Sequence, residues 1–263
     1  MSDVKIGIRL ESMGLPLRRA LQEAERLGVG GVQVDAVGDL APAALSQTGR
    51  RELRHLLRTH NLALTALGCP LRHGLDVPDN LEGRIEHVRT VLSLSADLGP
   101  RIVIVQAGRV PGPDDTSARG ALLTEALLAL AQHGDRTGTL LALETGLETG
   151  EVLGAYLDRF DTGGLGVNLD HANLLLRDFD PYESARALHG KIVHVHARDV
   201  RLGGASRLAQ EVPLGDGDID WLRLLGVLEE IAFRGWLTIE RETGVPSPGE
   251  MAAAVGFLRR FVR

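Results

Sequence analysis

Four side chains that could bind one metal ion stand at the ends of four successive strand-like segments. They are Glu144 in LALETG, Asp170 in GVNLDHANL, His196 in IVHVHARD and Glu240 in WLTIERE. Carboxylate oxygens with one imidazole nitrogen suit a single divalent ion, with Mn²⁺ the first candidate and Mg²⁺, Co²⁺ or Zn²⁺ as alternatives. Three unpaired carboxylates buried together would be costly, and a cation removes that cost. The alternative interpretation is four separate capping or salt-bridged groups.

Side-chain alternation favours the shared site. Successive side chains of a strand point to opposite faces, so in LLALE Leu141 and Leu143 lie on one face and Glu144 on the other. In KIVHVH, the same rule places Val193 opposite His196, and GVNLD and WLTIE repeat the pattern. The aliphatic face should meet helices, which places all four candidate ligands on the inner face at the carboxyl ends of their strands.

Eight strand-like runs alternate with longer amphipathic stretches along the whole chain. The runs are KIGIRL (5–10), GVQVDA (31–36), LALTAL (62–67), RIVIVQ (101–106), TLLALE (139–144), LGVNLD (165–170), KIVHVH (191–196) and WLTIER (236–241). Helices are clearest at 15–28, 81–99 and 219–235, with Gly28, Gly99 and Gly235 expected just past their ends and Asp218 or Asp220 capping the last one. Residues 201–218 form the longest predicted loop.

This alternation predicts an α/β fold, a single (β/α)8 TIM barrel that forms one domain over residues 1–263. The length of 263 residues is close to the roughly 250 residues of such barrels. A doubly wound open sheet is the alternative. Barrel enzymes carry their active sites at the carboxyl ends of the strands, where the four candidate ligands stand.

The motifs resemble those of the xylose isomerase-like barrel superfamily, which includes sugar phosphate isomerases and epimerases. The resemblance covers most of the chain and rests on LALETG, NLDHANLL, HVHARD, LGDGDIDW and FRGWLTIERE. It implies one divalent metal ion held by Glu144, Asp170, His196 and Glu240. In members that epimerise ketoses at carbon 3, the two glutamates also move protons, which implies catalytic roles for Glu144 and Glu240.

Three positions depart from the ketose 3-epimerase pattern. Asn173 replaces a histidine three residues after the strand-six aspartate, Leu202 replaces an arginine, and Gly150 replaces a second glutamate. These differences weaken the free-ketose epimerase assignment and leave the four predicted metal ligands unaffected. The DNA-repair endonuclease branch of the fold is disfavoured, because Cys69, Gln106 and Asn173 stand where it carries further zinc ligands.

A metal-assisted carboxylate suits proton abstraction next to a carbonyl. A bound cation stabilises the negative charge that builds on the carbonyl oxygen, while the carboxylate takes the proton. We expect an isomerase or epimerase of a small ketose, sugar acid or sugar phosphate, acting through an enediolate. A dehydratase of the inosose or dehydroshikimate type is the first alternative, and a non-catalytic sugar- or metal-binding protein is the second.

Five further polar residues near the strand ends are candidate substrate contacts. They are Arg9, Asp35, Gln106, Asn173 and Arg198. An arginine such as Arg198 could bind a carboxylate or phosphate with two hydrogen bonds, although each of the five could instead make structural contacts only. His194 lies one layer deeper on the inner face, which favours a supporting role over metal ligation.

Composition and charge limit the classes of binding partner and the cellular compartment that we expect for this chain. The net charge of −6 argues against nucleic-acid binding, and no apolar run approaches the roughly 20 residues of a membrane span. The single cysteine, Cys69, excludes an internal disulfide and suits the cytoplasm. Lys5 and Lys191, the two lysines, begin strand-like runs, which disfavours a Schiff-base aldolase. The expected partner is a small carbohydrate, and homo-oligomer formation is left open.

Overall fold

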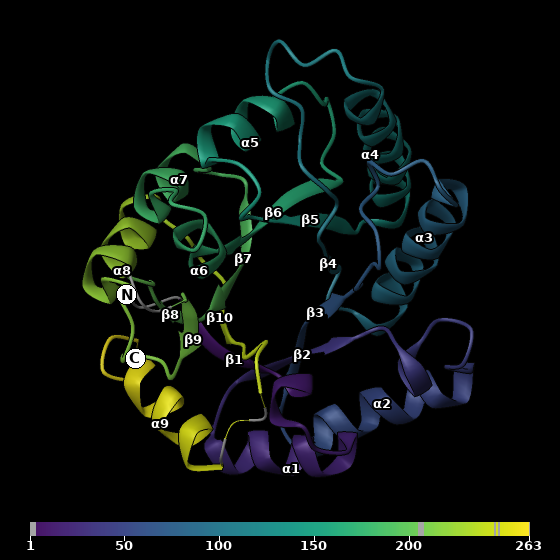
Figure 1. Ribbon diagram of the computed structural model, residues 1–263. Coiled ribbons are helices and arrows are strands. Elements are labelled where there is room, and N and C mark those ends of the chain that lie inside the picture. Colours follow the sequence, from purple (N-terminus) through teal and green to yellow (C-terminus); the bar gives the residue numbers. More distant parts are fainter. Residues whose placement is uncertain (1–3, 205–207, 245, 247, 263) are drawn as a thin grey trace.

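Eight parallel strands close into one barrel in this computed structural model (Figure 1). The order around the barrel is β1-β10-β7-β6-β5-β4-β3-β2. Barrel strands that are consecutive along the chain are therefore neighbours in the barrel, and β10 closes it against β1. Helices surround these strands. The structure describes residues 4–204, 208–244, 246 and 248–262. The predicted (β/α)8 TIM barrel is confirmed.

The barrel strands match the predicted runs with shifts of one or two residues at their ends. They are β1 (Lys5–Arg9), β2 (Gly31–Asp35), β3 (Ala63–Gly68), β4 (Ile102–Val105), β5 (Leu140–Glu144), β6 (Leu165–Asp170), β7 (Ile192–Ala197) and β10 (Trp236–Ile239). Aliphatic residues such as Leu141 and Val167 belong to the large core between strands and helices. A much smaller apolar cluster of Ala66, Ile104 and Ala142 lies on the inner side of the barrel.

One strand residue departs from simple alternation. The sequence pattern places Val193 on the outer face, but its side chain packs against the small inner cluster. The pairing of β6 with β7 explains the difference, because it passes from Ile192 to His194 and skips Val193. Such a bulge inserts one residue and redirects the side chains around it.

Each barrel strand is followed by helical structure. The α-helices are α1 (Leu17–Leu27), α2 (Gln47–Thr59), α3 (Leu81–Leu98), α4 (Ala118–Thr137), α5 (Gly150–Leu157), α6 (His171–Leu175), α7 (Pro181–Ala187), α8 (Trp221–Glu230) and α9 (Pro248–Leu258), and two 3-10 helices are η1 (Leu10–Met13) and η2 (Gly38–Leu40). Gly28 and Gly99 follow α1 and α3 in the left-handed conformation, as predicted. Asp220 caps α8, but Gly235 does not end it, because α8 stops at Glu230 and the chain turns at Ala232, where φ is 55°.

The predicted loop over residues 201–218 contains part of a small hairpin. Strand β8 (Asp199–Arg201) pairs antiparallel with β9 (Gln210–Val212), outside the barrel. Val200 and Val212 of this hairpin are buried. These two valines give an otherwise polar segment an apolar face that is shielded from solvent. The prediction of a loop is therefore wrong for these strands, while residues 205–207 of the same segment lie outside the described residues.

Across the described part of the chain, no helix is both long enough and apolar enough to cross a membrane.

Candidate active site

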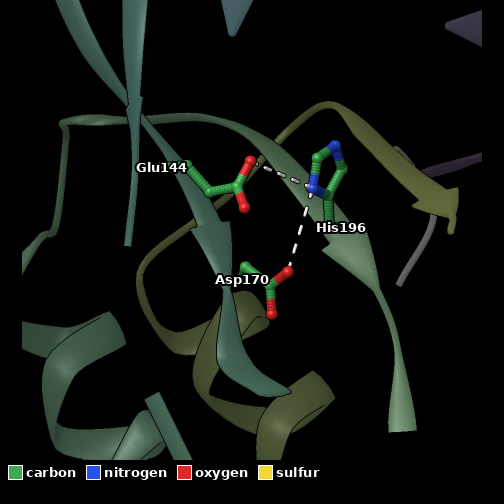
Figure 2. A group of neighbouring side chains, drawn as sticks. All are labelled: Glu144, Asp170 and His196. Carbon is green, nitrogen blue, oxygen red and sulfur yellow. Dashed lines mark ion pairs between the residues drawn. The ribbon is translucent and has the colours of Figure 1, made fainter. Parts of the chain in front are cut away.

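Three of the predicted metal ligands converge at the carboxyl end of the barrel strands, as Figure 2 shows. Glu144 ends β5, Asp170 ends β6, and His196 is the last residue but one of β7. Nδ1 of His196 lies 3.7 Å from Oε2 of Glu144 and 3.9 Å from Oδ2 of Asp170. One ligand atom from each residue lies within 4.8 Å of the other two. One cation can bridge that spacing, since ligand oxygens lie about 2.0–2.6 Å from Mg²⁺ or Ca²⁺.

Glu240 brings a fourth acidic side chain to the same histidine. It directly follows β10, which pairs with β7, and its Oε2 lies 2.6 Å from Nδ1 of His196. That oxygen is buried, and apart from this ion pair no donor among the described residues reaches it. A divalent ion could replace the proton that Nδ1 of His196 places against this oxygen and could bind both atoms. The residues present therefore fit a divalent metal ion.

The other oxygen of Glu240 is held by Arg9 at the end of β1. Arg9 forms ion pairs with both Glu240 and Asp35. Burial raises the pKa of Glu240, but the positive charges of His196 and Arg9 outweigh that effect and hold the pKa well below its usual range. Glu240 is therefore ionised near neutral pH, as a metal ligand must be.

Two neutral amides hold one oxygen of the Glu144 carboxyl group. Its Oε1 accepts hydrogen bonds from Nε2 of Gln106 at 3.1 Å and from Nδ2 of Asn173 at 3.0 Å. Burial raises the pKa of Glu144 to about 7, against the opposing charge of His196. A carboxyl group that titrates near neutral pH can both take and give a proton, so the two glutamates differ in their suitability as acid–base groups.

Arg198 is buried among protein carboxylates. Its guanidinium contacts Asp170 at 2.8 Å, Glu211 of β9 at 3.1 Å and Glu242 at 2.7 Å. Nη1 also donates to Oδ1 of Asn173 at 2.9 Å. Each guanidinium nitrogen therefore faces a protein group in the described structure, and the role of Arg198 as a substrate contact stays a prediction.

Two neighbouring cavities open beside the candidate ligands. The first, of about 210 Å³, is lined by residues that include Glu144, His196, Glu240 and Glu242 as well as the predicted substrate contacts Arg9, Asp35 and Gln106. The second, of about 190 Å³, shares Gln106 and Glu144 with the first and reaches Asn173. Arg198 lines neither of them. A larger hollow of about 670 Å³ between α2, α3 and α4 contains none of the candidate ligands.

Sequence reasoning did not name, as parts of the site, two amide side chains that contact the candidate ligands. Oε1 of Gln33 lies 3.0 Å from Nε2 of His196, and Nδ2 of Asn168 lies 3.0 Å from its Nδ1. Their positions carried a signal, because Gln33 stands two residues before Asp35 and Asn168 two residues before Asp170. The same alternation that pointed the acids inward applies to both amides.

Comparison with known proteins places the chain in a family. A family model described as the xylose isomerase-like TIM barrel matches residues 21–261. The chain belongs to the xylose isomerase-like TIM barrel family. Inosose dehydratase of Histophilus somni (strain 129Pt) is 28% identical over 153 residues, which cover 48% of this chain and 49% of that protein. The match thus spans about half the length of that relative. Protein YfiH of Bacillus subtilis (strain 168), named as uncharacterized, is 25% identical and covers 93% of this chain and 95% of its own.

Several solved structures share the whole fold with this chain at low identity. A xylose isomerase domain protein from Planctomyces limnophilus has a TM-score of 0.86 at 23% identity, with 98% of this chain and 97% of that chain covered. D-allulose 3-epimerase from Methylomonas sp. has a TM-score of 0.76 at 20% identity, covering 99% and 98%. The probable 3-DHS dehydratase AsbF from Bacillus anthracis has a TM-score of 0.78 at 18% identity, covering 97% and 98%. At these identities the likeness concerns the fold alone.

Proposed function

We propose that this protein is a divalent-metal-dependent isomerase or epimerase of a small ketose or related sugar, acting through an enediolate. One observation carries the proposal: two buried glutamates, an aspartate and a histidine nitrogen converge beside a cavity of about 210 Å³ at the carboxyl end of the barrel. Barrel enzymes perform their chemistry at that end. The names of proteins that are similar to this chain in sequence or in fold, which include an epimerase and dehydratases, add support.

The metal ion would be held by Glu144, Asp170, His196 and Glu240, with Mn²⁺ as the first candidate. When bound, such an ion polarises a substrate carbonyl and stabilises the negative charge that develops on its oxygen. Oxygen-rich ligand sets of this kind suit Mn²⁺, Mg²⁺ and Co²⁺, and the single imidazole also permits Zn²⁺.

The protein side chains would move the proton. Glu144 borders both cavities, and Gln106 and Asn173 hold its carboxyl group in a fixed orientation. We assign to Glu144 the removal of the proton from the carbon next to the carbonyl. Return of the proton by Glu144 to the former carbonyl carbon gives isomerisation, whereas delivery by Glu240 to the opposite face of the carbon that lost its proton gives epimerisation. Arg9 would keep Glu240 in place for that step.

The charge of the cavity favours an uncharged sugar over a sugar phosphate. Its lining includes four acidic side chains, Asp35, Glu144, Glu240 and Glu242, and one arginine, Arg9, that is already paired with two of them. A phosphate group would meet more negative than positive charge there, even beside a divalent ion. We therefore propose a neutral ketose as the substrate class.

A dehydratase is the second candidate, and a specific observation favours it. The curated relatives similar in sequence include inosose dehydratases, such as that of Histophilus somni. Dehydration begins with the same proton abstraction and then requires an acid to protonate the departing hydroxyl group. Two carboxyl groups with different pKa values, as Glu144 and Glu240 have, could supply the base and the acid for this reaction as well.

Deuterium exchange separates these reactions. Mn²⁺-loaded protein is incubated in D₂O with neutral ketoses, their phosphorylated forms and inososes. Deuterium uptake without loss of water is the expected result, uptake with loss of water identifies a dehydratase, and tight ligand binding without exchange identifies a non-catalytic binding protein. Glu144→Gln and Glu240→Gln should each lower turnover by about 10² or more. Glu86→Gln, at an exposed ion pair on α3, is the matched control.

We also propose that the protein acts in the cytoplasm with a small carbohydrate as its partner. Cys69 is buried, and burial raises the pKa of its thiol to about 12. Such a thiol is unreactive as a nucleophile and needs no oxidising compartment. Fractionation of the native host, with a cytoplasmic marker as reference, tests this location.

A further inference from the structure

We propose that Gln33 is a positioning residue that fixes which ring nitrogen of His196 faces the metal site. The inference rests on the proposed metal centre. Gln33 lies in β2, and His196 lies in β7, two strands that are not neighbours in the barrel. Their side chains meet inside it, with Oε1 of Gln33 3.0 Å from Nε2 of His196. Both residues are about 1% exposed, so water does not replace either partner.

The contact with Gln33 selects one form of the imidazole. An amide oxygen only accepts hydrogen bonds, so Nε2 of His196 must carry the proton. Without a metal ion, Nδ1 also carries a proton, because it lies 2.6 Å from the carboxylate oxygen Oε2 of Glu240. Binding of a metal ion would release that proton, free the lone pair of Nδ1 and leave the proton on Nε2 in place. Nδ1 is the atom that faces the carboxylates of Glu144, Asp170 and Glu240, at 3.7, 3.9 and 2.6 Å. The bond to Gln33 therefore directs the metal-binding lone pair toward the candidate ligands.

A second buried chain supports His196 from another side. Oδ1 of Asn168 lies 2.8 Å from Nδ1 of His194, whose Nε2 in turn lies 2.8 Å from Oγ1 of Thr238. Because His194 uses the oxygen of Asn168, the NH₂ group of Asn168 is the part that packs against His196, 3.0 Å from its Nδ1. These contacts hold the ring in place, and the contact with Gln33 assigns the proton on Nε2.

The role of Gln33 predicts an effect on metal affinity that differs from a general effect on packing. Loss of an acceptor behind a metal-bound histidine typically weakens metal binding by about 10–100-fold. Gln33→Met keeps the length of the side chain and removes the acceptor, whereas Gln33→Glu keeps an acceptor for Nε2. Thr65→Val is the matched control, because Thr65 is also buried inside the neighbouring strand β3 and donates only to the backbone oxygen of Val32.

The test measures the Mn²⁺ dissociation constant of the wild type and the three variants by competition with a chelator. We expect Gln33→Met to bind Mn²⁺ about 10–100-fold more weakly, Gln33→Glu to bind at least as tightly as the wild type, and Thr65→Val to match the wild type. Nitrogen-15 NMR of the Zn²⁺-loaded protein should show the proton of His196 on Nε2 in the wild type and lose that single form in Gln33→Met.

Other results would overturn the inference. Wild-type affinity in Gln33→Met would show that the contact does not position His196, and an equal loss in Thr65→Val would show a packing effect. A proton on Nδ1 of the wild-type His196 with metal bound elsewhere would refute the assigned form of the ring. Failure of the wild type to bind any divalent ion is a separate outcome, because it would refute the metal centre itself before Gln33 is considered.

Discussion

Removal of the Arg198 guanidinium should strongly destabilise the protein. Arg198 links the metal-ligand candidate Asp170 to Glu211 on the hairpin, with contacts of 2.8 and 3.1 Å. The three side chains are 2%, 0% and 3% exposed. In Arg198→Met the side chain keeps an apolar stem of similar length and loses its charge. Two buried carboxylates then lose the cation that compensates them.

The size of the effect follows from this burial. Breaking a buried ion pair by removal of one partner costs about 3–5 kcal/mol. Asp170 and Glu211 both lose their cation, while Glu242, whose side chain is 37% exposed, can be hydrated in its place. We therefore expect the free energy of unfolding to fall by about 4–5 kcal/mol. For a chain of this size that corresponds to roughly 8–20 °C in melting temperature.

Urea denaturation and calorimetry of the metal-free protein measure this loss. Arg26→Met is the matched control, because Arg26 pairs with Glu23 on the surface and is 62% exposed. Surface pairs contribute about 0–1 kcal/mol, so the control should unfold almost as the wild type does. A loss of less than about 1 kcal/mol in Arg198→Met, equal to that of the control, would refute the view that Arg198 is needed to compensate the buried acids.

Three further outcomes are expected. Wild-type protein should bind about one equivalent of Mn²⁺, and Asp170→Asn should lose it, as measured by elemental analysis after gel filtration; full metal content in the variant would contradict the ligand assignment. Glu148 accepts a hydrogen bond from Val110 N, and burial raises its pKa to about 7 from 4.5. Its contribution to stability is therefore full below pH 4.5 and is lost as pH rises through 7, so Glu148→Gln should gain stability relative to the wild type over that interval, by roughly 3 kcal/mol at most. Urea unfolding at acidic and alkaline pH tests this, and a constant difference between the two proteins would argue against it. In Arg9→Met, loss of the cation beside Glu240 should raise the pKa of that carboxyl group. Carbon-13 NMR titration of the Glu240 carboxyl carbon in the metal-free protein measures this shift, and an unchanged pKa would contradict the role assigned to Arg9.

The barrel and the convergence of the ligands could be predicted because both follow from local patterns. Alternation in LLALE places Glu144 opposite two leucines that pack against helices, and the same rule applies to Asp170. Parallel strands in a closed barrel then bring their carboxyl ends together. Both the alternation and the closure of the barrel can be inferred without knowing which residues far apart in the sequence are in contact.

The contacts around the ligands could not be predicted, because they depend on pairing between distant segments. Val193 faces inward only because the register of β6 against β7 skips it. The contact of Gln33 with His196 joins residues 163 positions apart across the barrel interior. Arg198 was a candidate substrate contact from its position after His196, yet its partner Glu211 reaches it only because β8 and β9 form a hairpin.

The departure of this chain from the ketose 3-epimerase pattern at Asn173 has a physical explanation in these contacts. Nδ2 of Asn173 donates to Glu144, while Oδ1 accepts from Arg198 at 2.9 Å. The amide thus joins a carboxyl group to a guanidinium and adds no charge of its own. A protonated histidine there would place a second cation beside Arg198 and would lower the pKa of Glu144. Asparagine at this position therefore changes the surroundings of the candidate base and leaves the candidate metal ligands in place, so the departure is compatible with the proposed metal centre.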